Sequence, residues 1–553
     1  MNSPLKCPFG IDDYKSVSTQ CYYVDKTLLA KDIAGLVDGT TTLFTRPRRF
    51  GKSLAISMLA TFFDEKIKNN SLYFDGKKIS LEPEYALMGQ FPVIHLSLKE
   101  IRPDSFEDLI QQVNDIISRE YLRHDELKES NEIYDIDRDY YSNLVRGGMN
   151  PTSLSHALFR LSFMLNKHHQ KKVCIFIDEY DTPIQRSHEK GFYDEAIRFF
   201  QSFYSEALKG NDCLKYAVMT GVLRIAKESL FSDLNNPIVD NGYDSAFQER
   251  FGFTKDEARA FADYFVADHS FEELWDWYGG YAFGDEEIMN PWSLISYFRY
   301  KKELKEYWTN TSSVSILSGL LGEASFAYSS LLGRLLNNEK VHLKPNFSTS
   351  YRDLDHSQEQ FVGFLIAAGY LTYSNEDKTL IRIPNIETSL VVRNEILNRY
   401  QPKENALSWI DMKNAVMEGD EEAFSLFLKR ILLRSFSYFD FNQERSYQAM
   451  TLTLISLLFE DYQVKSEVIE GEGRCDIQIQ PKEKGRFGAV IEIKHVKSKT
   501  SEPRLKDRAT AALKQIKVKN YAEDLILIGA APILAYGIAF YKKTAIVIAE
   551  KIR

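Results

Sequence analysis

Residues 42–54, with the sequence TLFTRPRRFGKSL, constrain the fold more than any other stretch of this chain. They read as a buried strand that passes through a short loop into an apolar helix. The loop ends in Gly51-Lys52-Ser53, the phosphate-binding end of a Walker A loop, in which backbone N–H groups and the lysine surround phosphates while the hydroxyl holds Mg²⁺. The full pattern has a glycine five residues before Gly51, where this chain has Arg46. The stretch therefore predicts a nucleotide site with an arginine-rich loop.

A second predicted strand, at residues 173–177, ends in the acidic pair Asp178-Glu179. An apolar run followed by two carboxylates is the Walker B pattern: the first supports Mg²⁺, here together with Ser53, and the second polarises the attacking water as the catalytic carboxylate. The two motifs together predict that the cofactors are ATP and Mg²⁺. The residues expected to bind the nucleotide are Arg46, Arg49, Gly51, Lys52, Ser53, Leu54, Asp178, Thr220 and Arg224.

Two of these residues have equally simple structural interpretations. Thr220 ends a third predicted strand, at residues 216–220, where a polar group near the γ-phosphate is common in P-loop ATPases, but a Thr-Gly turn explains it as well. Arg224 lies just beyond this strand and is either a phosphate-contacting or coupling arginine or, by default, an ordinary surface arginine.

Several segments of the chain resemble the bacterial predicted AAA-ATPase family, whose members are often fused to a PD-(D/E)XK nuclease-like domain. The segments are residues 23–27 (YVDKT), 46–53 (RPRRFGKS), 178–181 (DEYD), 220–221 (TG) and 231–236 (FSDLNN). The resemblance covers about residues 5–300 and a further patch near the C-terminus. In that family an arginine-bearing loop is the usual form, which implies a P-loop ATPase domain here despite Arg46.

Strands and helices alternate through the first half of the sequence, with further strands expected at residues 91–98 and a polar helical insertion at 104–168. This alternation predicts an α/β P-loop NTPase domain over residues 1–300, with a parallel sheet and helices on both faces. Residues 301–430 are expected to form a helical, winged-helix-like linker region, in which a helix over 361–372 precedes a small hairpin. Residues 431–553 are expected to form an α/β PD-(D/E)XK nuclease-like domain.

The composition indicates the number of domains, the expected location of the protein and a charged surface. A chain of 553 residues, of which 44% are hydrophobic and 27% charged, is expected to fold into two to four soluble domains. It has neither a run of eighteen apolar residues nor a signal-peptide core, so we expect a cytoplasmic protein that is not attached to a membrane. The net charge is −9, but residues 481–520 contain 12 Lys and Arg against 4 Asp and Glu, a local charge of +8. This basic region is a candidate surface for a polyanion.

The C-terminal region has a second set of polar residues on a predicted hairpin. Asp476 begins one strand, and Glu492 and Lys494 alternate on the next, so the latter two share a face. An Asp followed by Glu-x-Lys resembles the PD-(D/E)XK nuclease arrangement. Phosphodiester cleavage needs such residues because Mg²⁺ prefers carboxylate oxygens and lowers the pKa of the attacking water.

Each residue of this set has an expected role. Asp476 and Glu492 are expected to hold Mg²⁺ with the Ile493 carbonyl, while Lys494 orients or deprotonates the water. The family pattern implies that Glu444, on the preceding helix, supplies a further catalytic carboxylate and metal ligand. The alternative is an exposed hairpin with chance charges, since Glu-x-Lys is common in surface strands.

Two interpretations of the whole protein follow. In the first, ATP binding or hydrolysis gates a Mg²⁺-dependent nuclease that acts on nucleic acid, with DNA as the expected substrate, bound by the basic C-terminal region in defence against mobile DNA. In the second, the chain is a signalling or scaffold NTPase whose nuclease-like domain binds nucleic acid or a protein partner without cutting. The intact Asp476, Glu492 and Lys494 favour the first. We also expect a homo-oligomer; ring-forming ATPases borrow an arginine from a neighbouring subunit, but the sequence assigns that role to no residue here, so the number of subunits stays open.

Overall fold

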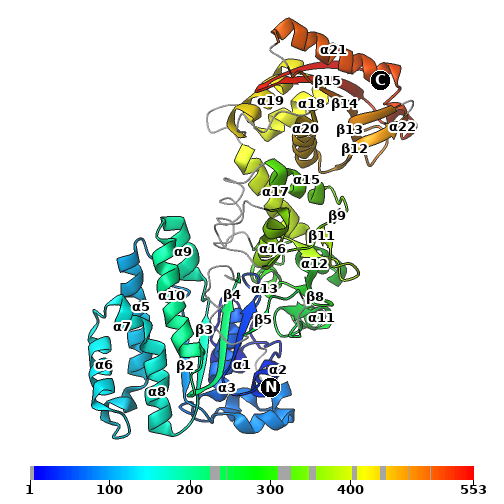
Figure 1. Cartoon of the computed structure of the whole chain (residues 1–553). Coiled ribbons are helices and arrows are strands. Elements are labelled where there is room, and N and C mark those ends of the chain that lie inside the picture. The colour runs from blue at the N-terminus through cyan, green and yellow to red at the C-terminus, as the bar shows by residue number, and fades with distance from the viewer. Residues whose placement is uncertain are drawn as a thin grey trace. The chain divides into compact units, whose positions relative to one another are not determined.

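The computed structural model describes residues 5–224, 237–243, 246–308, 326–347, 357–400, 408–435, 444–470, 473–497 and 500–553 (Figure 1). The chain forms two compact units: unit 1 comprises Met1–Ser313 and His342–Thr388, and unit 2 comprises Val314–Val341 and Ser389–Arg553. The segment 231–236, which contributes to the family resemblance, lies outside the described residues. The expected division into three domains at residues 300 and 430 stays a prediction.

A five-stranded parallel sheet forms the centre of unit 1, with the strand order β2-β3-β4-β1-β5 (Figure 1). The strands are β1 Thr40–Thr45, β2 Val93–Ser97, β3 Val173–Asp178, β4 Leu214–Gly221 and β5 Ile238–Asp240. The first four coincide with the strands predicted from apolar runs. The predicted parallel sheet is thus confirmed, and its strands are buried almost throughout because helices cover both faces.

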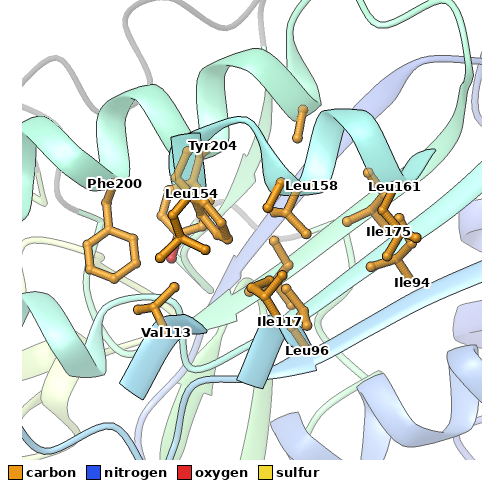
Figure 2. Packing of buried hydrophobic residues seen from close by; sticks show 14 of the residues in the cluster. Ile94, Leu96, Val113, Ile117, Leu154, Leu158, Leu161, Ile175, Phe200 and Tyr204 are labelled. Carbon is orange, nitrogen blue, oxygen red and sulfur yellow. The ribbon is translucent and has the colours of Figure 1, made fainter. Parts of the chain in front are cut away.

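Alternate residues of each strand pack against different sets of helices. On one face, side chains of β2 and β3 pack against helices α5 (Phe106–Arg123), α7 (Pro151–Ser155), α8 (Ala157–His169) and α10 (Tyr193–Leu208). Figure 2 shows this core, which includes Ile94, Leu96, Val113, Ile117, Leu154, Leu158, Leu161, Ile175, Phe200 and Tyr204. On the other face, Phe44, Phe176 and Val218 pack against the helix that follows the Lys52 loop. Each large apolar side chain buried in this way contributes about 1.5–3 kcal/mol relative to exposure.

The remaining elements of unit 1 surround this sheet. A three-stranded sheet has the order β6-β8-β7, and the expected helix and hairpin appear as α16 followed by antiparallel β10 and β11. The strands are β6 Phe253–Thr254, β7 Tyr281–Phe283, β8 Glu286–Met289, β10 Thr372–Tyr373 and β11 Leu380–Arg382, and β9 Val341–His342 pairs with β11. The helices are α1 Tyr14–Gln20, α2 Leu28–Ala34, α3 Lys52–Phe63, α4 Ser71–Phe74, α5 Phe106–Arg123, α6 Asp135–Arg146, α7 Pro151–Ser155, α8 Ala157–His169, α9 Thr182–Lys190, α10 Tyr193–Leu208, α11 Lys255–Tyr264, α12 Phe271–Tyr278, α13 Pro291–Arg299 and α16 Gln358–Ala368, with 3₁₀ turns η1 Lys78–Leu81, η2 Pro83–Leu87 and η3 Asp125–Glu129.

Unit 2 is built on a mixed sheet with the order β12-β13-β14-β15-β16, in which only β14 and β15 run parallel. The strands are β12 Tyr462–Glu470, β13 Gly473–Pro481, β14 Gly488–His495, β15 Ile533–Tyr541 and β16 Thr544–Lys551. The helices are α15 Phe326–Leu336, α17 Ile386–Tyr400 (which begins in unit 1), α18 Trp409–Glu418, α19 Glu421–Ser435, α20 Glu444–Leu458, α21 Glu502–Val518 and α22 Glu523–Leu527. The predicted hairpin is present as β13 and β14.

Helix α21 crosses the sheet of unit 2 at close range (Figure 1). A Cβ atom on Gly537 would lie 2.0 Å from the carbonyl oxygen of Ala509, so only glycine allows this approach. Within the described ranges, none of the helices combines the length and the apolar character needed to cross a lipid bilayer.

Two candidate active sites

The phosphate-binding loop of unit 1 passes through two residues with positive φ, Arg49 (φ 72) and Gly51. Gly51 has φ +85 and directly precedes α3, so the loop turns into the helix through a left-handed conformation that non-glycine residues rarely adopt. A Cβ atom there would meet nothing within 4 Å, so the backbone angle and not the space selects glycine. Ser53 and Leu54 lie in the first turn, where backbone N–H groups have no partner within the helix and can bind an anion.

Lys52 lies buried under its own loop. Its Nζ donates hydrogen bonds to the carbonyl oxygens of Arg46 (3.0 Å) and Pro47 (2.9 Å), which uses two of its three donors. Burial lowers the pKa of Lys52, and the charges of Glu179 and Asp181 oppose this effect. The ammonium group is thus held by carbonyl oxygens of its own loop, with the Glu179 and Asp181 carboxylates within electrostatic reach.

Three residues predicted from separate segments meet at the carboxyl ends of β3 and β4. The carboxylate of Asp178 accepts a hydrogen bond from the Thr220 hydroxyl (2.6 Å) and another from the Ser53 side chain. Burial and the nearby charge of Glu179 raise the pKa of Asp178, while the two hydroxyls lower it. A hydroxyl beside a carboxylate is the donor set that hard Mg²⁺ prefers, so these residues fit that ion.

Glu179 occupies a turn with φ +53, a conformation that is uncommon for residues with a side chain. Its Oε2 accepts a hydrogen bond from the Thr182 hydroxyl at 3.0 Å. Burial lowers the pKa of Arg49, and the charge of Glu179 offsets this, so the two side chains lie within electrostatic reach. The Arg49 guanidinium also lies over the Trp292 ring, 4.2 Å from its centroid. Phosphate binding by Arg49 stays a prediction.

The interpretation of Arg46 as a phosphate ligand does not fit the structure. Its side chain is fully buried, and its Nη2 lies 2.6 Å from the Oδ1 atom of Asp240 on β5. The guanidinium sits between the rings of Phe251 and Phe283, 5.0 Å from each centroid. The charge of this guanidinium is already paired, and aromatic rings cover it. It therefore stabilises the loop and does not face a phosphate.

Arg224 lies at the end of a described segment, directly after Leu223. It is half-buried, and its Nε atom has no hydrogen-bond partner among the residues that the structure describes. Its expected contact with phosphate therefore stays a prediction.

The hairpin of unit 2 brings its carboxylates together. Oδ2 of Asp476 accepts a hydrogen bond from the backbone N–H of Ile493 at 2.7 Å, which places Asp476 beside the strand that carries Glu492. Burial and the neighbouring charge of Glu492 raise the pKa of Asp476 to about 7. Burial likewise raises the pKa of Glu492. The Glu492 carboxylate therefore lies within electrostatic reach of Asp476.

Three further side chains, two of them predicted from the sequence, surround this pair. Lys494 Nζ and Gln515 Nε2 both donate to Oε1 of Glu492, at 2.7 and 2.6 Å. Oε2 of Glu492 is buried and has no hydrogen-bond partner within the described ranges. Glu444, at the start of α20, accepts the backbone N–H of His495 at 2.9 Å, and its charge contributes to the raised pKa of Asp476.

Two family models match the parts of the chain that contain these sites. Residues 8–231 match the family described as predicted AAA-ATPase, and residues 442–550 match the PD-(D/E)XK nuclease superfamily. The chain joins an AAA-ATPase-like domain to a PD-(D/E)XK nuclease superfamily domain. An uncharacterized protein in the vnfD 5' region of Azotobacter chroococcum mcd 1 is 26% identical over 412 residues, which is 72% of this chain and 72% of the relative.

The carboxylates of the PD-(D/E)XK domain are the candidate ligands for a divalent metal ion. Among the described residues, no three His, Cys, Asp or Glu side chains are gathered closely enough, as they stand, to hold one ion. Protein donors hold Asp476 and Glu444, and Glu492 keeps one buried oxygen without a partner. A buried unpaired carboxylate oxygen is stabilised by a cation, so the chemistry of the site fits Mg²⁺ with Asp476 and Glu492 as ligands. The Ile493 carbonyl stays a predicted ligand.

Sequence reasoning missed two residues of the PD-(D/E)XK site. Gln448 donates to Oδ1 of Asp476 at 2.7 Å, and the Tyr521 hydroxyl accepts from Gln515 at 3.3 Å. Gln448 could have been found, because it lies four residues after Glu444 on α20 and so faces the same way. Tyr521 follows α21 and had no comparable signal.

The AAA-ATPase-like domain also has a buried carboxylate that no role had been assigned to. Oδ2 of Asp181 accepts the backbone N–H groups of Val222 and Leu223, both at 2.9 Å, and burial raises the pKa of Asp181. Asp181 therefore connects the Walker B turn to the segment after β4, and this segment leads to Arg224.

We expect Asp181→Ala to destabilise the AAA-ATPase-like domain, because two backbone N–H groups lose their hydrogen-bond acceptor. Each of these groups that stays buried should lower the free energy of unfolding by about 1–3 kcal/mol. Asp181→Asn should cost less, because its amide oxygen still accepts. Urea unfolding followed by tryptophan fluorescence measures both. Equal stabilities of the two variants would contradict this role.

Proposed function

We propose that this protein binds and hydrolyses ATP and uses its nucleotide state to gate a Mg²⁺-dependent nuclease that cleaves nucleic acid, with DNA as the substrate, in defence against mobile DNA. The observation that carries the proposal is the meeting of Asp476, Glu492 and Lys494 on β13 and β14, with Gln515 on the same carboxylate. The expected homo-oligomer and cytoplasmic location stay predictions.

Each residue of the PD-(D/E)XK site has its own role in the proposed reaction. Asp476 and Glu492, with Glu444 beside them, would hold Mg²⁺. When bound, that ion supplies positive charge to the phosphate oxygens and lowers the pKa of the attacking water. Lys494 Nζ lies 2.7 Å from Oε1 of Glu492, where the ammonium group orients the water or, once it has lost a proton, the neutral amine takes the proton of the water. Gln515 holds Glu492 in place from α21.

The AAA-ATPase-like domain supplies the switch in this proposal. Lys52 and the first N–H groups of α3 bind the phosphates, Ser53 and Asp178 would hold Mg²⁺, and Glu179 orients the water that attacks the γ-phosphate. Thr220 donates a hydrogen bond to Asp178, which supports a role for Thr220 in responding to the nucleotide state. Lys52→Ala should therefore remove any response of cleavage to ATP.

A second function is favoured by one observation. The oxygens of Asp476 are already held by protein donors, from Ile493 and Gln448, so the domain could bind nucleic acid without cutting it. Cleavage assays separate the two functions.

We expect the purified full-length protein to nick or cut plasmid DNA with Mg²⁺ and to lose this activity in EDTA. Asp476→Asn should lower the cleavage rate at least about a hundredfold, because the metal loses a charged ligand. Asp524→Asn, an exposed residue of the same domain, is the matched control and should cut like the wild type. No cleavage of any DNA or RNA by the wild type, with or without ATP, would overturn the nuclease and favour the second function.

A further inference from the structure

Helix α21 has two exposed flanks on either side of its buried face. The buried residues are Leu505, Ala509, Ala512, Leu513 and Ile516. At 3.6 residues per turn, positions 504, 508, 511 and 515 form one row along the helix. Positions 506 and 517 form a second row, about half a turn away from the first.

The two rows lead to different strands of the sheet. Gln515, at the end of the first row, donates to Glu492 on β14 at 2.6 Å. Lys517, at the end of the second, pairs with Glu550 on β16 at 2.5 Å. The first row thus ends at the predicted catalytic carboxylate, and the second ends two strands away from it.

The first row carries unpaired positive charge. Arg504 and Arg508 are exposed, and neither has an ion-pair partner in the part of the chain that the structure describes. The next position of the row is Ala511, whose small side chain covers little of the surface between Arg508 and Gln515. A guanidinium suits this setting because its planar donors match phosphate oxygens.

We propose that Arg504 and Arg508 form a phosphate track, which guides the backbone of a nucleic acid strand along one flank of α21 to Glu492. The inference rests on the proposed nuclease function. Such contacts bind phosphates irrespective of base sequence. The row from 504 to 515 spans about 16 Å at 1.5 Å per residue, so the track reaches at most about five nucleotides from the cut at 3.4 Å per nucleotide.

The test compares two double variants that remove the same charge from the same helix. Arg504→Ala/Arg508→Ala removes the track, and Lys506→Ala/Lys517→Ala removes two cations from the other flank. Both are made in the full-length Asp476→Asn protein, so that binding of a short fluorescent DNA duplex is measured without cleavage, over about 50–200 mM salt.

The track variant should bind at least several-fold more weakly, and the slope of log K against log salt should fall by about 2, since each lost phosphate contact contributes about 0.9. The flank variant should keep the slope of the parent protein. Equal losses in both variants, or an unchanged slope in the track variant, would overturn the track while leaving the nuclease intact. Failure of the parent protein to bind any nucleic acid would overturn both proposals.

Discussion

Replacement of Asp240 by alanine should destabilise unit 1 by about 3–5 kcal/mol, because it removes the carboxylate that pairs with the buried Arg46 guanidinium. Arg46 is fully buried, and Asp240 supplies both a carboxylate oxygen at 2.6 Å and a carbonyl oxygen at 3.0 Å. The carboxylate also accepts the backbone N–H of Gly242 at 3.1 Å. Alanine removes the charge and this acceptor together.

Urea unfolding of the full-length protein measures the effect. Four of the five tryptophans, at positions 275, 277, 292 and 308, belong to unit 1, so fluorescence follows mainly this unit. Asp240→Asn keeps an acceptor and should fall between alanine and wild type. The double variant Arg46→Met/Asp240→Leu should recover much of the loss, since apolar side chains of similar size replace buried ion pairs well. A loss below about 1 kcal/mol in Asp240→Ala would show that the pair contributes little.

The same variants bear on nucleotide binding. The carbonyl oxygen of Arg46 accepts a hydrogen bond from Lys52, so a shift of Arg46 moves the loop that holds the lysine. We therefore expect Asp240→Ala to weaken ATP binding even where the domain is folded. The double variant Arg46→Met/Asp240→Leu lacks both charges. Its affinity for ATP therefore shows whether binding depends on the charge of Arg46 or on the position of the loop.

The features that sequence patterns predicted are local ones. The turn from β1 through Gly51 into α3, and the acidic pair after β3, lie within short segments whose apolar runs and glycine determine their conformation. Alternation along a strand likewise predicted that Glu492 and Lys494 share a face, and a hydrogen bond now joins them.

Contacts between distant segments were beyond these patterns. Arg46 and Asp240 are 194 positions apart and meet only because β5 pairs with β1. β5 has three residues, too few for an apolar period to be recognised. An arginine in a phosphate-binding loop therefore looked like a phosphate ligand, whereas the sheet order makes it a buried support.

Replacement of Lys494 by methionine should lower the rate of DNA cleavage by about 10²–10⁴, the usual effect of removing a group that orients or deprotonates the attacking water. Methionine keeps the apolar part of the side chain but not the ammonium group that contacts Glu492. The affinity for DNA measured in EDTA should stay close to that of the wild type, because the variant removes only one of the many positive charges of the basic region.

Lys517→Met is the matched control. Lys517 also pairs with a glutamate of the same domain, Glu550 on β16, but on the flank of α21 away from Glu492. It should therefore cut DNA at nearly the wild-type rate. A similar loss in both variants would mean that Lys494 acts through the fold or the overall charge, and an active Lys494→Met would remove it from the reaction.

Lys494→Arg then separates the two chemical roles of the lysine. Arginine keeps the positive charge beside Glu492 but cannot give up its proton in a protein, so it can orient a water but cannot act as a base. If Lys494 only orients the water, the arginine variant should recover part of the activity that methionine loses. If the lysine accepts the proton, the two variants should be equally inactive, and the rate measured with each at saturating Mg²⁺ decides between these roles.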